Sequence, residues 1–190
     1  AVDCGSTNIE SIDWINEQNV DVLVLDHHQV PQPAPAACAL INPQLATEDE
    51  PDFRELCSAG LAFKLLHAIV KEGRAQGISE MESYDVRPFL DLVALGTIAD
   101  LVPLVRENRI LAVNGLKQLN ATNRLGLRAL IEAARIQGAI GGFEVGFQLG
   151  PRLNAAGRLE SATEALDLLQ AKNPDIAVEL AAKLDRRNRD

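Results

Sequence analysis

The sequence lacks a cysteine framework, a long apolar run and an excess of positive charge. Its three cysteines, Cys4, Cys38 and Cys57, are irregularly spaced and form no CxxC pair, which favours reduced thiols in a cytoplasmic protein. No apolar stretch is long enough for a transmembrane helix, and no signal peptide opens the chain. The net charge of −9 counts against an extended nucleic-acid surface, although a local basic groove remains compatible with it.

The composition is that of an ordinary soluble protein, with 47% apolar and 24% charged residues among 190. The chain opens inside an expected strand and closes inside an expected helix over residues 173–190. Asn173 and Pro174 suit the start of that helix, and no Gly or Pro follows to end it. We therefore expect the chain to be a segment of a longer protein.

The first thirty residues predict a strand–helix–strand unit. Residues 1–2 form the tail of a strand ending at Asp3, and a capping box of Thr7 and Glu10 begins the helix. The apolar run over residues 20–25 predicts a buried parallel strand. If the two strands are neighbours, Asp3 and the residue after the second strand lie at corresponding strand ends, roughly 5 Å apart.

Asp26-His27-His28 follows that second strand directly. Open α/β sheets bind ligands beyond the carboxyl ends of their strands, so these side chains are predicted to lie where chemistry is usually placed. A carboxylate and two imidazoles can bind metal or move protons. Alternatively, these three residues are simply the polar start of the loop that follows the strand and have no chemical role.

A strongly apolar helix is predicted from about residue 86 to Asp100, and such a helix is buried. Asp100 near its end then needs a partner, for which a metal ion is one candidate. Together, Asp3, His27, His28 and Asp100 form an oxygen-rich set with imidazole that suits Mn²⁺ or Mg²⁺ better than Zn²⁺. Taken separately, each residue also has an ordinary structural explanation.

The Gly- and Ala-rich block over residues 150–158 contains Arg152, Asn154 and Arg158. Small residues allow close backbone approach, and arginine recognises phosphate with its planar fork. The block therefore predicts either a phosphate contact or a tight, well-packed turn with surface arginines. A short strand is expected around residues 39–41, and mainly helical structure follows residue 105.

Four motifs in order resemble the DHH phosphoesterase superfamily and, more narrowly, its RecJ-type single-strand-specific exonucleases. The motifs are Val2-Asp3-Cys4-Gly5, Asp26-His27-His28, Gly96-Thr97-Ile98-Ala99-Asp100 and Gly150-Pro151-Arg152-Leu153-Asn154-Ala155-Ala156-Gly157-Arg158. By this resemblance Asp3, His27 and Asp100 would bind metal, and His28 would face the scissile phosphate. Asp26 would support the metal shell, and Arg152, Asn154 and Arg158 would lie near the substrate strand.

The resemblance implies an α/β fold: residues 1–105 would be the C-terminal part of a parallel-sheet catalytic domain, and residues 106–190 its helical remainder with the start of a connecting helix. It implies Mn²⁺- or Mg²⁺-dependent 5′-to-3′ digestion of single-stranded DNA, with a single-strand-binding protein or helicase as a further partner. The family's Asp-x-Asp strand and its C-terminal DHH-associated domain are not in the sequence. We therefore expect the segment alone to be inactive.

Two other functions fit the same motifs. A DHH phosphodiesterase acting on oligonucleotides or cyclic dinucleotides is the enzymatic alternative, and a scaffold that keeps the fold without metal chemistry is the other.

Overall fold

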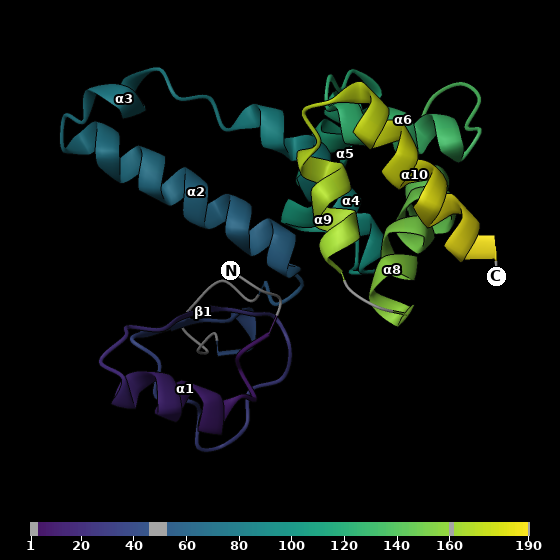
Figure 1. Ribbon diagram of the computed structural model, residues 1–190. Coiled ribbons are helices and arrows are strands. Elements are labelled where there is room, and N and C mark those ends of the chain that lie inside the picture. Colours follow the sequence, from purple (N-terminus) through teal and green to yellow (C-terminus); the bar gives the residue numbers. More distant parts are fainter. Residues whose placement is uncertain (1–3, 46–52, 160–161, 190) are drawn as a thin grey trace. The chain divides into compact units, whose positions relative to one another are not determined.

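The computed structural model describes residues 4–45, 53–159 and 162–189, and the chain forms two compact units (Figure 1). Unit 1 comprises Ala1–Val86 and Val102–Asn108, and unit 2 comprises Arg87–Leu101 and Arg109–Asp190. Among the described residues, no helix combines the length and apolar character needed to cross a bilayer.

Unit 1 holds a two-stranded parallel sheet and three helices in its described part. Its elements in chain order are α1 (Ile9–Glu17), β1 (Leu23–Leu25), β2 (Ala39–Ile41), the 3₁₀ turn η1 (Pro43–Leu45), α2 (Ser58–Ala75) and α3 (Ser79–Glu82). The sheet pairs Leu23 with Ala39 and Leu25 with Ile41. The short strand at residues 39–41 confirms the sequence prediction. The strand of residues 1–2, which was predicted to be the parallel neighbour of β1, lies outside the described residues.

The β1 strand is shorter and more open than its apolar run predicted. Asn19 adopts φ 58° after α1, and regular pairing begins only at Leu23. In the described part of the sheet, β2 is the one strand paired with β1. Successive side chains point to opposite faces, and Leu23 is 63% exposed on one face while Val24 is buried on the other. A fully buried strand would need cover on both faces, so this part of the prediction was wrong.

The turn before α1 brings Ser6 next to β1. Asn8, rather than Thr7, precedes the helix, and no side chain caps it, so the predicted capping box was wrong. Gly5 has φ +132°, and a Cβ there would lie 2.8 Å from Cγ1 of Val24. Only glycine tolerates both this backbone conformation and this close approach.

Unit 2 is helical. It contains the 3₁₀ turn η2 (Arg87–Phe89) and helices α4 (Leu90–Ala99), α6 (Leu125–Ala133), α7 (Gly142–Glu144), the π-helical turn η3 (Val145–Leu149), α8 (Gly150–Leu159), α9 (Thr163–Gln170) and α10 (Pro174–Arg189), with most of α5 (Arg106–Asn120). Its core consists of buried aliphatic side chains that include Leu119, Leu127, Leu130, Leu149, Leu168 and Leu184. The fold is thus mostly helical with a small parallel sheet.

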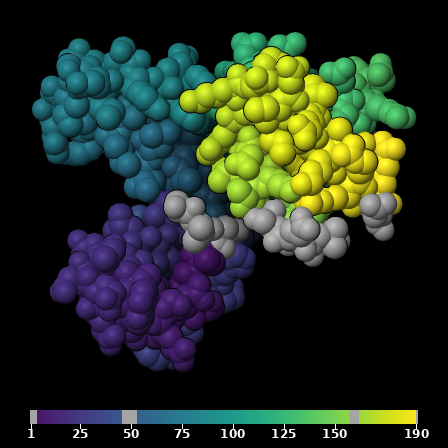
Figure 2. Space-filling view, viewed as in Figure 1, coloured from purple at the N-terminus to yellow at the C-terminus, as the bar shows by residue number. Residues whose placement is uncertain are grey.

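The last helix confirms its sequence prediction in detail. Oδ1 of Asn173 accepts hydrogen bonds from the N–H groups of Asp175 and Ile176, at 2.8 and 3.3 Å, and so caps α10. Ala177, Ala181 and Leu184 form the buried stripe that packs on α6 and α8. Figure 2 shows the side chains of α9 and α10 against one another along one face of this unit.

Candidate active site

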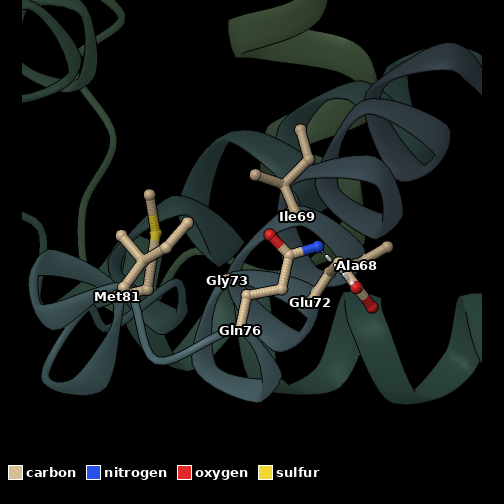
Figure 3. Close-up of a pocket in the computed structure, with 7 residues that line it drawn as sticks. Ala68, Ile69, Glu72, Gly73, Gln76 and Met81 are labelled. Carbon is tan, nitrogen blue, oxygen red and sulfur yellow. Dashed lines mark hydrogen bonds between the residues drawn. The ribbon is translucent and has the colours of Figure 1, made fainter.

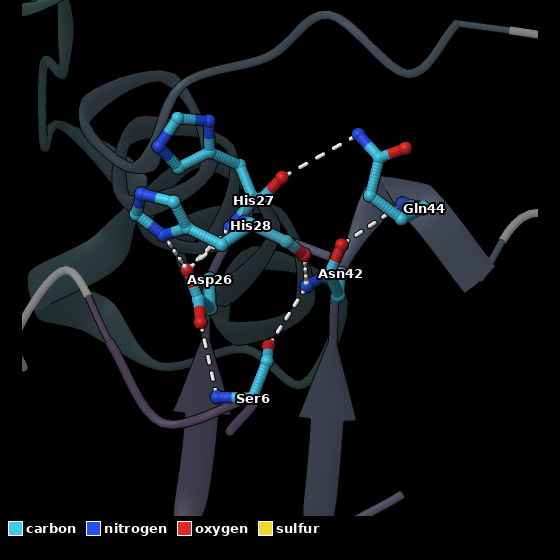
Figure 4. Close-up of polar contacts among 6 residues, drawn as sticks. All are labelled: Ser6, Asp26, His27, His28, Asn42 and Gln44. Atoms are coloured by element: carbon cyan, nitrogen blue, oxygen red, sulfur yellow. Dashed lines mark hydrogen bonds and ion pairs between the residues drawn. The ribbon is translucent and has the colours of Figure 1, made fainter. Parts of the chain in front are cut away.

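Asp26 is the first residue after β1, and its carboxylate is held by several donors. Its N–H continues the sheet by donating to the carbonyl of Ile41, and the side chain is only 2% exposed. Oδ2 accepts from the N–H of Ser6 at 3.0 Å, and Oδ1 accepts from the N–H groups of His27 and His28 at 2.7 and 3.2 Å (Figure 4). The carboxylate is therefore a fixed acceptor at the carboxyl end of the strand.

These hydrogen bonds determine the ionisation of Asp26. Burial by itself raises the pKa of this carboxyl, because desolvation disfavours the charged form. The N–H of Ser6, the ring and N–H of His28 and the hydroxyl of Ser6 outweigh that effect, and the pKa of Asp26 lies well below its ordinary value. Asp26 is consequently an anion at neutral pH.

His28 is oriented by this anion. Its Nδ1 lies 2.7 Å from Oδ1 of Asp26, and an ionised carboxylate can only accept, so Nδ1 carries the proton of this contact. This contact fixes the orientation of the imidazole ring. The side chain is 57% exposed, so an oriented imidazole reaches solvent at the strand end. This arrangement suits a general acid or base.

His27 lies beside it and is more enclosed. The two imidazole centroids are 4.4 Å apart with an interplanar angle of 50°, and Nε2 of His27 is buried. A neutral imidazole nitrogen held in place by its neighbours is a suitable ligand for a divalent metal.

Residues after the end of β2 support this site and were not predicted from the sequence. Nδ2 of Asn42 donates to Oγ of Ser6 and to the carbonyl of His28, both at 2.9 Å. Oδ1 of Asn42 accepts from the N–H of Gln44, and Nε2 of Gln44 donates to the carbonyl of His27 at 3.4 Å. The signal was present, because Asn42 follows the expected strand at 39–41 and parallel strands end at one edge.

The structure brings together only part of the predicted metal set. Asp3 lies outside the described residues, and Asp100 belongs to unit 2 whereas His27 and His28 belong to unit 1. Within the described ranges, no group of three or more His, Cys, Asp or Glu side chains converges on one point. The carboxylate and imidazole donors remain of the type that Mn²⁺ and Mg²⁺ accept, so the donor chemistry fits these ions.

Asp100 is exposed, which corrects the expectation that it would be buried. The helix itself is buried as predicted, through Val93, Ala94 and Leu95 among others. However, α4 ends at Ala99, and Leu101 adopts φ 59° and is exposed, which turns the chain outward. Asp100 therefore sits at the C-cap of α4 at the surface.

Within unit 2, the third and fourth motifs pack against each other. A Cβ on Gly150 would lie 3.1 Å from Cβ of Ala99 and 3.1 Å from the carbonyl of Val145. Because Gly150 has no side chain, the start of α8 approaches the end of α4 closely. The helix end that carries Asp100 is thus adjacent to the block that carries Arg152.

That block is helical, which excludes the tight turn considered from the sequence. Nε and Nη2 of Arg152 both lie 2.9 Å from Oδ1 of Asp185 on α10, and Nη1 donates to the carbonyl of Gln148 at 2.7 Å. The Arg152 side chain is 13% exposed, so its guanidinium is engaged inside the unit. Asn154 is exposed on α8, and Arg158 belongs to the same helix.

We expect Arg152→Met to lower the free energy of unfolding by about 2 kcal/mol, because it leaves Asp185 partly buried without this partner. A double-mutant cycle with Asp185→Asn, followed by thermal unfolding, should show coupling between the two sites. Arg186→Met changes an exposed arginine on α10 and serves as the matched control. Equal effects of the two arginine substitutions would contradict a structural role for Arg152.

A separate pocket lies in unit 1 between α2 and α3 (Figure 3). Its volume is about 410 Å³, and its lining consists of Ala68, Ile69, Glu72, Gly73, Gln76, Ile78 and Met81. Nε2 of Gln76 donates to Oε1 of Glu72, four residues earlier at the end of α2. One carboxylate among apolar groups offers no catalytic constellation, so the candidate site remains at the ends of β1 and β2.

About half of the chain, including the first two motifs, matches a known family. The model of the DHH family, N-terminal domain, matches residues 1–97. A single-stranded-DNA-specific exonuclease RecJ of Haemophilus influenzae is 42% identical over 190 residues, which cover 98% of this chain and 33% of that protein.

Solved structures agree with this similarity. A crystal structure of exonuclease RecJ bound to manganese matches with a TM-score of 0.84 and 36% identity, over 99% of this chain and 45% of that one. RecJ from Thermus thermophilus in complex with Mg²⁺ matches with a TM-score of 0.62 and 39% identity, over 73% of this chain and 21% of that one. The chain thus spans less than half the length of the proteins it matches.

Proposed function

Because this chain belongs to the DHH family, we propose that it is part of a metal-dependent phosphodiesterase whose full-length parent removes nucleotides from the 5′ end of single-stranded DNA. The observation that carries the proposal is the buried, ionised Asp26 that orients the exposed imidazole of His28. The similarity to single-stranded-DNA-specific exonucleases and to structures with Mn²⁺ or Mg²⁺ supports the substrate and the cofactor.

Each site residue has a proposed role. Asp26 holds His28 with Nδ1 protonated, and Nε2 of His28 faces the scissile phosphate, where it can transfer a proton to the leaving oxygen. Asp3, His27 and Asp100 are the proposed ligands of two Mn²⁺ or Mg²⁺ ions. When bound, such ions lower the pKa of water and stabilise charge on the phosphate oxygens.

The substrate strand is proposed to lie along α8. Asn154 is exposed there, and Arg158 lies further along the same helix. Arg152 is proposed to help bind the strand in one of two ways. It holds α8 in position through its contact with Asp185, or its guanidinium also contacts a phosphate. A DNA-degrading parent would work in the cytoplasm, with a single-strand-binding protein or helicase as partner, and residues 1–105 would belong to its catalytic domain.

The decisive experiment measures Mn²⁺-dependent release of nucleotides from 5′-labelled and 3′-labelled single strands by the full-length parent. We expect 5′ release, and we expect His28→Ala to reduce the rate about 100- to 10,000-fold, the usual range for loss of a general acid or base. His67→Ala, an exposed histidine on α2, is the matched control.

Other outcomes separate the alternatives. Faster turnover of dinucleotides than of long strands would favour a phosphodiesterase of short substrates. No hydrolysis and no thermal stabilisation by Mn²⁺ would indicate a scaffold, since a ligand that binds the folded state stabilises it. Activity of the isolated segment that is lost on Asp100→Ala would contradict the expectation that the segment alone is inactive.

A further inference from the structure

The register of the sheet brings Asn42 level with Asp26. Leu25 pairs with Ile41, and the ladder continues where the N–H of Asp26 donates to the carbonyl of Ile41 at 3.2 Å. Asn42 and Asp26 are the residues that follow the two strands, so they lie at the same edge of the sheet. Asn42 is only 7% exposed, and a buried amide needs partners for its donors and its acceptor.

The orientation of the Asn42 amide follows from two unambiguous partners. Oδ1 accepts from the N–H of Gln44 at 2.9 Å, and a backbone N–H can only donate. Nδ2 donates to the carbonyl of His28 at 2.9 Å, and a carbonyl can only accept. Nδ2 also donates to Oγ of Ser6 at 2.9 Å (Figure 4). The amide nitrogen therefore directs both of its N–H groups into the site.

An ordinary role as a turn residue accounts for only one side of this amide. The bond from the N–H of Gln44 to Oδ1 of Asn42, and the bond from the N–H of Leu45 to its carbonyl, begin the turn η1. Aspartate supplies the same side-chain acceptor and is equally common at such positions. The turn thus needs the oxygen of the amide, and it leaves both N–H groups of Nδ2 unexplained.

Ser6 connects Asn42 to the carboxylate of Asp26. Oγ of Ser6 accepts from Nδ2 of Asn42, and the Ser6 hydroxyl in turn forms a hydrogen bond with Asp26. The N–H of Ser6 donates to Oδ2 of the same carboxylate at 3.0 Å. Ser6 is fully buried, so water does not compete for these bonds. Asn42 consequently bonds to the backbone of His28 directly and to the carboxylate beside its ring through Ser6.

We propose that Asn42 is a positioning residue for His28, which fixes the His28 backbone and, through Ser6, the carboxylate that orients the imidazole. The side chain of His28 is 57% exposed, so packing does little to hold the ring. Its orientation depends on Oδ1 of Asp26, 2.7 Å from Nδ1. The proposal rests on the proposed function, and it assigns Asn42 no contact with the strand.

The test measures kcat and KM for Mn²⁺-dependent digestion of a 5′-labelled single strand by the full-length parent. We expect Asn42→Ala to lower kcat about 10- to 100-fold, the scale for partners that orient a site group. KM should change little, because the lost interaction does not bind the strand. Asn42→Asp keeps the acceptor that begins η1 but has no N–H to donate, so it should behave like the alanine variant.

A crystal structure of the Asn42→Ala parent provides a readout that does not depend on activity. The ring of His28 should lie away from Oδ1 of Asp26 or occupy more than one position. Ser6→Ala should also lower kcat. The double variant Ser6→Ala/Asn42→Ala should lose less than the product of the single losses, because the two residues act in part through one link.

Asn16→Ala is the matched control. It removes a hydrogen bond from another side-chain amide of unit 1 to a backbone carbonyl, that of Ala36, at 2.8 Å. Ala36 precedes β2, at the opposite end of the strands from the site, so kcat should not change. Thermal unfolding of every variant checks that folded protein is assayed.

Each outcome decides the proposal. Full kcat in Asn42→Asp would show that only the turn needs this side chain and would overturn the positioning role. A His28 ring that stays 2.7 Å from Asp26 in the Asn42→Ala crystal would overturn it whatever the kcat. Equal losses in Asn42→Ala and Asn16→Ala would indicate a general structural effect and would also overturn it. A wild-type parent that does not digest the strand would overturn the proposed function, whereas the crystal structure still decides what holds His28.

Discussion

Asp26→Ala is expected to lower the free energy of unfolding by about 3 kcal/mol or more. The substitution removes an acceptor of the hydrogen bonds from Ser6, His27 and His28 in a nearly fully buried position. Unpaired buried donors cost about 1–3 kcal/mol each, and part of that cost is recovered by relaxation toward water. The activity of the parent should fall about 100-fold as well, because the His28 imidazole loses the carboxylate that orients it and the His27 backbone N–H loses its acceptor.

The pH dependence of this contribution follows from the depressed pKa of Asp26. A carboxyl whose folded pKa is below its unfolded value stabilises the fold at pH values above the unfolded pKa. That stabilisation is lost as pH falls through the folded pKa. At pH 7 the full stabilising contribution of the Asp26 carboxylate should therefore appear in the difference in free energy of unfolding between wild type and Asp26→Ala.

The measurement combines thermal unfolding at pH 7 with Mn²⁺-dependent digestion by the full-length parent. Asp21→Asn changes an exposed carboxylate just before β1 and should leave both quantities unchanged. If Asp26→Ala melted like wild type, the hydrogen bonds around this carboxylate would not be contributing to stability.

Gly126→Ala should be about as destabilising, for a steric reason. A Cβ at this position of α6 would lie 1.8 Å from the carbonyl oxygen of Leu168 on α9 and 2.6 Å from its carbon. Both atoms belong to backbone, so the two helices must separate, and Leu168 is part of the buried core. Overpacking of this kind costs about 3 kcal/mol, and more where the backbone cannot relax.

Gly142→Ala provides the control, since nothing lies within 4 Å of its added Cβ. It should change the free energy of unfolding by less than about 1 kcal/mol, the scale of a Gly-to-Ala change in helix propensity. Thermal unfolding of the parent, together with amide exchange in α6 and α9, measures both variants. Equal melting of the two would show that α6 and α9 are not in backbone contact.

Features that depend on local pattern were predicted well from the sequence. The strand that leads to Asp26, the short strand at 39–41 and the capped helix from Asn173 were all predicted from local sequence patterns. The motif residues Asp26, His27 and His28 were also located correctly at a strand end, because a parallel strand exposes its C-terminal neighbours. Their catalytic and metal-binding roles remain predictions.

Features that depend on distant partners could not be predicted. Arg152 forms an ion pair with Asp185, which lies 33 residues later on another helix. Local sequence patterns do not predict a pair at that separation. Asp100 was expected to be buried because its helix is, yet the positive φ of Leu101 ends the helix at the surface.

The close approach of Gly150 to Ala99 couples the residue types that these two positions can accept. The space between them holds one methyl group, which here belongs to Ala99. Glycine at position 99 would relieve one of the two 3.1 Å contacts of a methyl gained at position 150, and the carbonyl of Val145 would have to yield by a few tenths of an ångström for the other. Among related sequences, these two positions should therefore covary, with alanine at one accompanied by glycine at the other, although they lie fifty-one residues apart.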